Sequence, residues 1–510
     1  MKQKEPSTDS KEILSKLNLE NLYIDASLQY NIDHLKIILE GCTDVVYREI
    51  TLSRADTQLK CLLLFTDGLV DSLNINENII KPLNSIYKFN VAPFCDEKIT
   101  LESITDYINI NEFEKIKNYK EIIDGIFSGD TVLMLQGFNE ALMLNTKGWE
   151  ARSLEEPAAE SLIRGPREGF TESFRTNTGL IRRKLKDPKL KIKELTIGSR
   201  TNTSVGVLYM EDIVNKDALD EVIQKLQEIK IDGIFESGYL EQFLENNTYS
   251  PFPQLQVTER PDKVCGNLLE GRIAILTDGA PQALILPISF FQLFQSPEDY
   301  NERYMFGNLT RWLRYIGFFI ATSFPSIYVA LISFHQEMIP ADLMLDLAKT
   351  RTQVPFPPVV EAILMELTIE FLREASARLP RTIGQTIGIV GAIVIGDAAV
   401  RANLASPAMV IVVAITAIGS YVMPHYSTTY PLRSIRFPMI FMAATFGAFG
   451  IIVTWIWIII HLCSLDSLGY PYLSPLAPLN DDLLNDVLIR RPLWKIRRRP
   501  KTSNKNSYRW

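Results

Sequence analysis

The chain has 510 residues, and its 53 lysine and arginine residues against 60 aspartate and glutamate residues give a formal net charge of −7. This balance argues against a nucleic-acid-binding protein, which ordinarily carries a basic surface. The averages of 46% hydrophobic and 22% charged residues resemble those of a soluble protein, but they conceal two unlike halves. Residues 1–120 carry a charge every few positions, whereas residues 315–334, 402–432 and 437–465 carry none. We therefore predict a soluble front half followed by a membrane-embedded back half.

The cysteines and the two ends of the chain set further limits. Five scattered cysteines without a CxxC pair predict neither a disulfide framework nor a zinc site. The opening residues, MKQKEPSTDSKEIL, lack the apolar core of a signal peptide, so we expect the front half in the cytoplasm. Residues 490–510 hold nine basic residues and no acidic one, which predicts that the tail, residues 466–510, is also cytoplasmic and contacts anionic membrane lipids. Two cytoplasmic ends require an even number of spans.

Four segments are long and apolar enough to cross a membrane, since a span needs about 20 residues. They define a transmembrane domain over residues 311–465 and cover residues 312–334, 382–401, 407–426 and 439–463. A fifth apolar stretch, residues 273–294, contains Asp278, Pro281 and Pro287, which interrupt a helix. We interpret it as a re-entrant or interfacial segment within a linker of residues 251–310. In this topology the loop 336–381, with a helix favoured over residues 361–378, lies outside.

The soluble half contains two stretches that resemble each other at an offset of about 145 residues. Residues 49–52 match 194–197, and residues 64–70 match 208–214. Each copy reads as two strands joined by a polar turn and followed by a helix, over residues 77–86 and 216–229 respectively. We predict two related α/β subdomains, residues 28–150 and 151–250.

Between the two copies lies the run Arg164-Gly-Pro-Arg167-Glu168-Gly-Phe170, followed by a basic amphipathic helix that includes Arg175. A Gly-rich turn before a helix is able to hold an anion, but the Walker spacing GxxxxGK[ST] is missing. Two roles stay open: packing between the subdomains, and contact with the inner membrane surface or a partner. Arg164, Arg167, Glu168 and Arg175 are our candidates for coupling the soluble half to other parts of the receptor or membrane.

No motif of a common enzyme class occurs in the sequence. GxSxG, HExxH and a Gly-rich dinucleotide fingerprint after a strand are all missing, and the four histidines are dispersed. We therefore predict that the chain is not an enzyme and binds no metal or cofactor.

The second predicted span, residues 382–401, has two distinct faces on a helical wheel. The face suited to close helix packing carries the small residues Gly384, Gly388, Ala392 and Gly396. The opposite face carries Thr386, Val390, Ile393 and Asp397.

Two interpretations of Asp397 stay open. In one it pairs with Arg401, one helical turn later, near the cytoplasmic end of the span. In the other, copies of this helix surround an axis, with Val390 and Ile393 as a hydrophobic gate and Asp397 as an acidic ring that favours cations. Four spans supply few helices for a pore within one chain, so conduction requires several chains around a symmetry axis.

Several runs in order along residues 40–500 are similar to a known family. They are GPREGFTE at 165–172, PFP at 355–357 followed by Glu361 and LREA at 372–375, IGDAAV at 395–400, SPLAP at 474–478, and RRPLW at 490–494. In these runs the chain resembles the A subunits of bacterial spore germinant receptors, the GerA family. Residues 1 to about 31 lie outside the resemblance, and residues 1–27 are expected to be a variable extension.

The resemblance implies a non-enzymatic subunit of a nutrient receptor in the spore inner membrane. It implies a transporter-like B subunit and a lipoprotein C subunit as partners, and a homo-oligomer, expected to be a pentamer, that conducts cations to trigger germination. The family commonly has Gln at the position of Asp397, which weakens the acidic-ring interpretation. A scaffold that couples a nutrient-binding partner to downstream machinery is the alternative to a channel. Secondary transport is disfavoured, because no inverted repeat of spans is visible.

Overall fold

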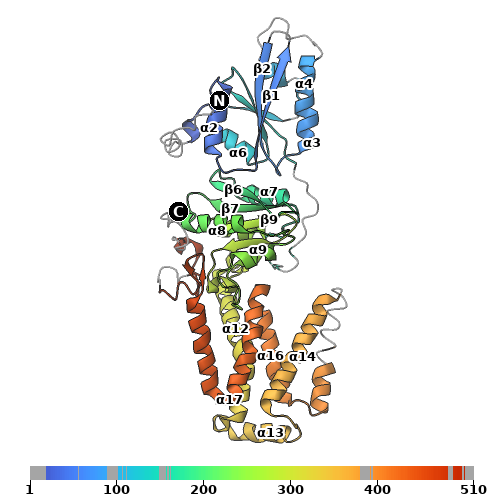
Figure 1. Cartoon of the computed structure of the whole chain (residues 1–510), viewed down its shortest axis with the longest axis vertical. Helices are drawn as coiled ribbons and strands as arrows, with labels where there is room; N and C mark the ends of the chain where they lie inside the picture. The colour runs from blue at the N-terminus through green and yellow to red at the C-terminus, as the bar shows by residue number, and fades with distance from the viewer. Residues whose placement is uncertain are drawn as a thin grey trace.

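The computed structural model describes residues 19–54, 57–88, 101–105, 107–110, 112–148, 157, 160, 162, 164–379, 391, 394–479, 486–496 and 499. Two α/β domains are stacked on a helical domain along the long axis of the molecule (Figure 1). The predicted fold class, an α/β first half followed by a helical second half, is confirmed in these terms.

The first α/β domain is built on a five-stranded antiparallel sheet with strand order β1-β2-β4-β5-β3. Its strands are β1 (Val45–Arg54), β2 (Thr57–Thr66), β3 (Phe113–Ile116), β4 (Thr131–Leu135) and β5 (Ala141–Leu144). Its helices are the short η1 (Leu19–Asn21), α2 (Leu28–Ile38), α3 (Ser72–Asn74), the π-helix η2 (Ile75–Ile80), α4 (Lys81–Lys88), α5 (Leu101–Thr105) and α6 (Tyr119–Ile126). Apolar clusters lie on both faces of the sheet, one beneath α2 and α6 and the other beneath η2, α4 and α5.

The second α/β domain repeats this arrangement with strand order β6-β7-β9-β10-β8. Its strands are β6 (Leu190–Ile197), β7 (Thr203–Met210), β8 (Gln256–Thr258), β9 (Ile273–Thr277) and β10 (Ala283–Leu286). Its helices are α7 (Phe174–Lys184), α8 (Lys216–Glu228), α9 (Ser237–Leu244) and α10 (Pro261–Leu268). One face of the sheet is covered by α7 and α10, and the other by α8 and α9.

Equivalent local signals occur in both domains. Ser27 and Ser173 cap the N-termini of α2 and α7, and the Asp71 side chain caps the start of α3 as that of Asn215 caps the start of α8. Gly137 and Gly279, which are 279 − 137 = 142 residues apart, hold positive φ angles of 93° and 84° in the matching turns between the last two consecutive strands. The structure therefore contains two complete copies of one α/β unit.

The repeat extends further than the sequence prediction allowed. We placed the end of the second copy at residue 250, but β8, α10, β9 and β10 complete its sheet up to Leu286. The prediction of a linker with a re-entrant segment at 273–294 is therefore wrong. The run Ile273–Thr277 is apolar because β9 is a central strand with every residue buried, and such a strand looks like a membrane segment in sequence.

The helical domain begins after the short helices η3 (Phe290–Phe294) and α11 (Glu298–Asn301). It contains α12 (Tyr304–Ser333), η4 (Gln336–Met338), α13 (Ala341–Arg351), α14 (Pro358–Arg378), a helical segment at 394–401, α16 (Pro407–Tyr421) and α17 (Tyr426–Ser464). Helix α13 crosses the end of this domain that is farthest from the α/β domains (Figure 1). Among the described residues, α12 and α17 are long and apolar enough to cross a membrane, and α16 is a shorter apolar helix.

Helix α17 is a hairpin of two helices rather than a single rod. Gly447, inside it, has a φ of 61° and a ψ of −140°, and lies against Phe334 and His335 at the far end of α12. Both ends of α17 instead contact the second α/β domain, through His425 next to Lys263 and through His461 next to Ser250. The prediction of one span over residues 439–463 is therefore wrong, since the turn at Gly447 lies inside it.

Helix α14 also differs from its predicted place. It belongs to the loop 336–381, which we expected to lie outside, but it packs against α12, α16 and α17 within the helical domain (Figure 1). Its charged side chains made it look like a loop helix in the sequence.

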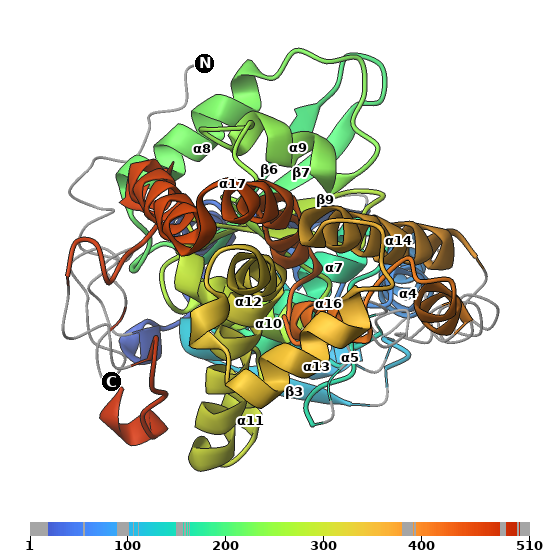
Figure 2. The same cartoon turned by 90° about the horizontal axis from the view of Figure 1, so that it is seen from below.

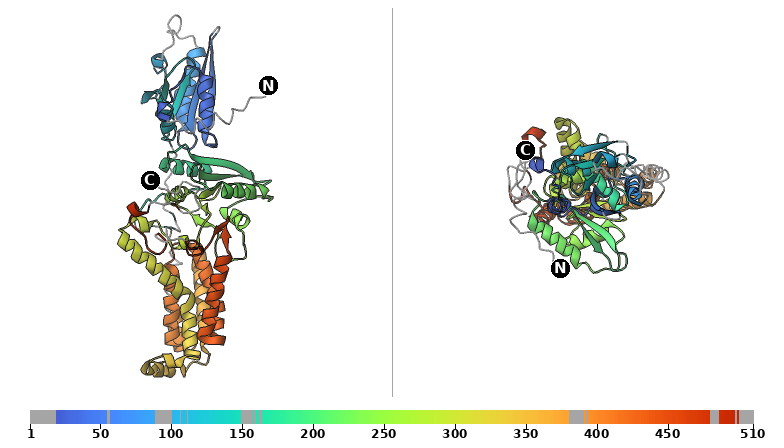
Figure 3. Two further views of the ribbon diagram at one scale, coloured as in Figure 1. Left: turned by 90° about the vertical axis from the view of Figure 1, so that its left-hand side faces the viewer. Right: turned by 90° about the horizontal axis from the view of Figure 1, so that it is seen from above.

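The C-terminal segment returns to the α/β domains. The hairpin of β11 (Asp466–Ser467) and β12 (Tyr470–Pro471) joins them through the Tyr472 hydroxyl, which donates to the Pro253 carbonyl at 2.6 Å. Arg490, shortly before η5 (Leu493–Lys495), donates to the Glu302 carbonyl at 3.2 Å. The described ends of the chain therefore lie on the same side of the helical domain (Figure 3).

Candidate functional site

Helix α7 fastens the two α/β domains to each other. Its Arg182 donates from Nε and Nη2 to the two carboxylate oxygens of Asp44, in the first domain, at 2.7 and 3.1 Å. Both side chains are fully buried, and the guanidinium also lies 4.4 Å from the ring centre of Phe127. A buried bidentate pair fixes the relative position of the domains, because separating it would leave a charge without a partner.

The backbones of the two domains also approach closely at this interface. A Cβ on Gly179, in α7, would come within 2.7 Å of the Gly68 carbonyl oxygen, and a Cβ on Gly68 within 2.6 Å of the Arg175 carbonyl oxygen. Gly68 has a φ of 85°, which L side chains rarely adopt. Glycine is therefore required on both sides of the contact.

The four coupling candidates lie around α7 and the segment before it. Arg175 binds Glu194 at 2.8 Å and Asp67 at 3.4 Å, so it joins both domains. Glu168 binds Lys184 at 2.9 Å, and the Arg164 carbonyl accepts a hydrogen bond from Asn301. Arg167 is exposed in the same segment. The packing interpretation of this region fits these contacts, whereas its role in coupling stays a prediction.

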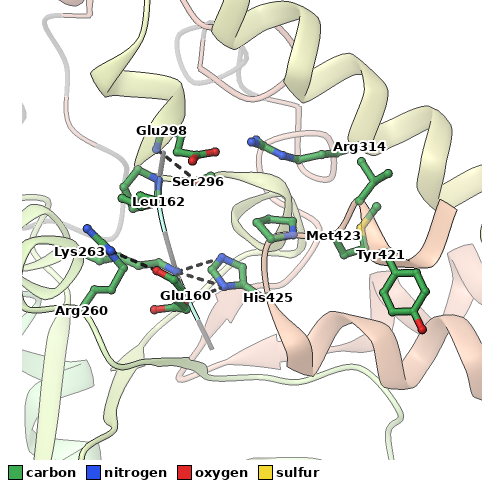
Figure 4. Close-up of a pocket in the computed structure, with 13 residues that line it drawn as sticks. Glu160, Leu162, Arg260, Lys263, Ser296, Glu298, Arg314, Tyr421, Met423 and His425 are labelled. Atoms are coloured by element: carbon green, nitrogen blue, oxygen red, sulfur yellow. Dashed lines mark hydrogen bonds and ion pairs between the residues drawn. The ribbon is translucent and has the colours of Figure 1, made fainter. Parts of the chain in front are cut away.

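A polar cluster around His425 joins the second α/β domain to the helical domain (Figure 4). His425 is the N-cap residue of α17, and its buried ring lies 3.0 Å from Nζ of Lys263, in α10, and 3.2 Å from Oε1 of Glu160. Lys263 binds the same Glu160 oxygen at 3.1 Å, and Gln256 lies 3.1 Å from His425 Nε2. One imidazole thus holds together the start of α17, α10, β8 and the segment between the α/β domains.

Burial and charge decide the protonation of this cluster. Burial lowers the pKa of His425, and the Lys263 charge lowers it further, so the imidazole is neutral at pH 7. Burial also lowers the pKa of Lys263, while Glu160 opposes this effect. Burial alone would raise the pKa of Glu160, but Lys263 and the hydrogen bonds from His425 and Thr258 bring it below its usual value. We infer a Lys263–Glu160 ion pair with a neutral histidine against it.

A cavity of about 260 Å³ lies beside this cluster, between the second α/β domain and the helical domain. Its other walls are Ser296, Pro297 and Glu298 before α12, and the turn from Tyr421 to Pro424 between α16 and α17 (Figure 4). Arg314 lines it while binding Asp299 at 2.7 Å. The cavity therefore lies where the turn between α16 and α17 faces the second α/β domain.

Paired charges run along α14 inside the helical domain. Near its start, the fully buried Glu361 binds Arg351 at 3.2 Å and accepts from the Ser406 backbone N–H at 3.0 Å. Further along, Glu366 pairs with Arg436 and Glu370 with Arg433, both on the first half of α17.

Arg436 also donates to the Ala321 carbonyl of α12 at 2.8 Å. It therefore ties three helices together at a point where both Arg436 and Glu366 are buried. Ionisable groups in an apolar helical domain ordinarily face one another in this way.

The second predicted span lies largely outside the described residues. This applies to Thr386, Val390 and Ile393 of the predicted pore face, and to Gly384, Gly388 and Ala392 of the predicted packing face. Gly396, by contrast, is placed, and a Cβ there would lie 3.7 Å from the Val410 side chain, an ordinary packing distance. The candidate roles of these residues stay predictions.

Asp397 is placed, and it binds Arg401 at 2.7 Å with both side chains exposed. The local pair that we considered for Asp397 is therefore present. Its position is not the one expected, because the chain continues from Arg401 to Ser406, which bonds to Tyr328 near the far end of α12 and to Glu361 at the start of α14. These contacts place the pair toward the end of the helical domain away from the α/β domains.

Sequence reasoning missed the His425 cluster and the charge pairs of α14. A usable signal for the pairs was present, since Arg433 and Arg436 are the charged residues between two long uncharged runs. His425 gave no comparable signal, because its side-chain partners are 130 or more residues away in sequence. Among the described residues, no group of three or more His, Cys, Asp or Glu side chains is arranged to hold a metal ion.

Comparison with known proteins decides the family. The model of the Bacillus/Clostridium GerA spore germination proteins matches residues 33–502. The chain belongs to the GerA family. This GerA-family chain is 42% identical to the uncharacterized membrane protein YfkQ of Bacillus subtilis, over 95% of this chain and 93% of the relative. It is 43% identical to spore germination protein KA of Bacillus subtilis, over 94% of this chain and 88% of the relative.

Two further comparisons concern other species. The chain is 41% identical to spore germination protein GerLA of Bacillus cereus, over 90% of this chain and 92% of the relative. The crystal structure of the N-terminal domain of the A subunit of the Bacillus megaterium spore germinant receptor GerK3 is 32% identical, with a TM-score of 0.42, over 52% of this chain and 97% of that one. The family predicted from the sequence is confirmed. The expectation that the chain is not an enzyme agrees with it, because germinant receptor subunits of the GerA family are receptor components.

Proposed function

We propose that this chain is the A subunit of a nutrient germinant receptor in the spore inner membrane and forms a ligand-gated cation channel. The observation that carries the role in germination is the GerA match over residues 33–502, together with relatives named spore germination proteins that align over nearly the whole chain. A transporter-like B subunit and a lipoprotein C subunit are the proposed partners. The proposed oligomer is a pentamer of this chain.

The exposed apolar surface of the helical domain supports its place in a membrane. Large apolar side chains that are a third or more exposed follow α12, α16 and α17: Leu309, Trp312, Leu313, Ile316, Phe319, Ile411, Ile415, Ile418, Phe441, Phe446, Phe449, Ile452, Ile456, Trp457, Ile459 and Ile460. A soluble domain rarely exposes so large an apolar surface. Lipid, or the apolar face of another copy, is the environment that this surface fits.

The two halves of α17 alter the proposed topology. Residues 427–446 and 448–464 are each near the length of about 20 residues that crosses a bilayer. With α12, α14, the segment ending at Arg401 and α16, the chain then crosses the membrane six times rather than four. Six is even, so the α/β domains and the C-terminal tail lie on the same side of the membrane. The basic tail favours the cytoplasm as that side.

Contacts between the domains suggest how a signal reaches the proposed gate. Movement of the second α/β domain acts on His425 at the start of α17, and α17 is bound to α14 through Arg433 and Arg436. Helix α14 in turn touches the proposed pore segment, since a Cβ on Gly391 would come within 2.8 Å of Leu372. In the proposed channel, Thr386, Val390, Ile393 and Asp397 face the axis, and Val390 and Ile393 form the constriction.

Potassium flux from proteoliposomes that contain the purified protein tests the proposal. A smaller side chain in a hydrophobic constriction admits water, so Val390→Ala and Ile393→Ala are expected to raise the basal flux. Ile395→Ala is the matched control, because the same truncation on the opposite side of the helix leaves the constriction unchanged. Equal flux from all variants would refute the pore assignment.

The second candidate function is a non-conducting scaffold that couples a nutrient-binding partner to downstream germination machinery. The contacts among the α/β domains, α17 and α14 favour it as much as they favour a channel, because they provide coupling without requiring a pore. A protein that stays monomeric in lipid nanodiscs and passes no potassium would support the scaffold.

A further inference from the structure

Helix α9 of the second α/β domain carries an exposed aromatic face. Tyr239 and Phe243 lie one turn apart on this helix, and Phe235 lies just before its N-cap residue Glu236. The exposed fractions of Phe235, Tyr239 and Phe243 are 68%, 42% and 45%. The rings of Phe235 and Tyr239 meet edge to face, with centroids 6.1 Å apart. The opposite side of α9, with Leu240 and Leu244, is buried in the domain core. A helix on the surface of a soluble domain ordinarily carries polar residues on its outer side, so this face calls for a partner.

The segment after α9 connects this face to the end of the helical domain. The Asn246 side chain donates to Asp466 at 2.8 Å, and Ser250 lies 2.9 Å from His461 near the end of α17. Between them, Tyr249 is fully exposed. The His461 ring is stacked on Trp457, an exposed residue of the apolar surface of α17, with centroids 6.0 Å apart. Aromatic side chains thus lead from the apolar face of α17 to α9.

The arrangement of the domains leaves α9 uncovered on the membrane side. It lies on the part of the second α/β domain nearest the helical domain (Figure 1). Seen from the far end of the helical domain, α8 and α9 extend beyond α17 (Figure 2). A bilayer around the helices would therefore pass beneath this overhang.

Aromatic side chains are enriched where a membrane meets water, because their rings are apolar and a tyrosine hydroxyl still reaches water. The acidic residues of α9 would oppose contact with anionic headgroups, but Glu241 is less of an obstacle than its type suggests. Burial, with the charges of Glu245 and Glu236, raises the pKa of Glu241 to about 7. About half of this carboxyl is therefore uncharged at neutral pH.

We propose that the aromatic face of α9 and Tyr249 lie in the headgroup layer of the cytoplasmic leaflet and hold the second α/β domain against the membrane. This proposal rests on the proposed membrane position of the helical domain. The partner is the lipid surface itself, favoured over a second copy of the chain by the continuity of this face with the apolar surface of α17.

Nitroxide labels on single cysteines test the proposal with the full chain in lipid nanodiscs. The background carries Cys95→Ser and Cys463→Ser, while Cys42, Cys61 and Cys265 are buried. Tyr239→Cys and Phe243→Cys report on α9. Phe449→Cys is the lipid reference, and Phe113→Cys, at an aromatic residue of similar exposure in the first α/β domain, is the water reference. Collisions with oxygen, which concentrates in lipid, are compared with collisions with a water-soluble nickel complex.

At Tyr239 and Phe243 the ratio of oxygen to nickel collisions is expected to rise several-fold above that at Phe113, toward the value at Phe449. A ratio equal to that at Phe113 would overturn the proposal and leave the membrane position of the helical domain intact. Low collision rates with both reagents would also overturn it and indicate a protein partner, such as a second copy. A water-like ratio at Phe449 would refute the membrane position itself, and with it the α9 contact.

Discussion

The buried pair of Arg182 and Asp44 gives the sharpest quantitative prediction for the α/β domains. In Asp44→Ala, the Arg182 guanidinium keeps its hydrogen bond to the Asp187 carbonyl and its place against Phe127, but loses both bonds to the carboxylate. Removing one partner of a fully buried pair costs about 3–5 kcal/mol. The loss is this large because the remaining charge stays in a medium of low dielectric constant.

The assay is thermal unfolding, measured by calorimetry, of a fragment of residues 1–290, which comprises both α/β domains. For a fragment of this size each kcal/mol shifts the midpoint by about 2–4 °C, so Asp44→Ala is expected to lower it by about 6–20 °C. The matched control is Asp232→Ala, which removes the partner of Arg200 from a pair with about four-fifths of each side chain exposed. An exposed pair contributes at most about 1 kcal/mol.

The double variant Asp44→Leu/Arg182→Leu separates the pair from the packing around it. With both charges gone no buried charge is left unpaired, so this variant is expected to unfold at a higher temperature than Asp44→Ala alone. If Asp44→Ala unfolded within about 2 °C of the wild type, the reasoning would be refuted, because Arg182 would then have found water or another partner.

Three further predictions concern other contacts. Gly179→Ala is expected to destabilise the α/β fragment by about 1–3 kcal/mol in urea unfolding, since its Cβ would meet backbone, whereas Gly266→Ala, in an equally helical position with nothing within 4 Å, is expected to stabilise it by up to about 1 kcal/mol. The pKa of Glu241 in the folded protein lies above its value in the unfolded chain, so its contribution to stability is complete below about pH 4.5 and is lost as the pH rises through about 7. Glu241→Gln should therefore make the stability of the fragment depend less on pH across this range. An unchanged dependence of stability on pH would contradict the assignment. Glu366→Gln and Arg436→Gln should each lower the yield of folded protein in detergent. In a double-mutant cycle, their effects on the free energy of unfolding should be coupled by more than about 0.5 kcal/mol, while additive effects would exclude a direct interaction.

The division into a soluble and an apolar half could be predicted from charge alone, because a bilayer or a large apolar core excludes unpaired charges over long stretches. The repeat was also visible, since equivalent strands and turns need similar residues. The end of the second copy, however, was not visible in the sequence. The run Ile273–Thr277 has the same composition whether lipid or other strands surround it, and only the pairing of β9 with β7 and β10 distinguishes the two.

Charged residues of the helical domain were also misplaced from the sequence, because their surroundings depend on distant residues. Glu361, Glu366 and Glu370 made α14 resemble an exposed helix, because a sequence does not reveal which distant arginines neutralise a carboxylate. The turn at Gly447 was hidden for a related reason, since an apolar run has the same hydropathy whether it continues or folds back. By itself the sequence determined the family, the two halves and the capping residues that begin helices such as α2, α7, α8 and α16. The tertiary structure decided which charges meet, where the long helix reverses and how His425 joins the domains, because each of these depends on contacts between residues far apart in the chain.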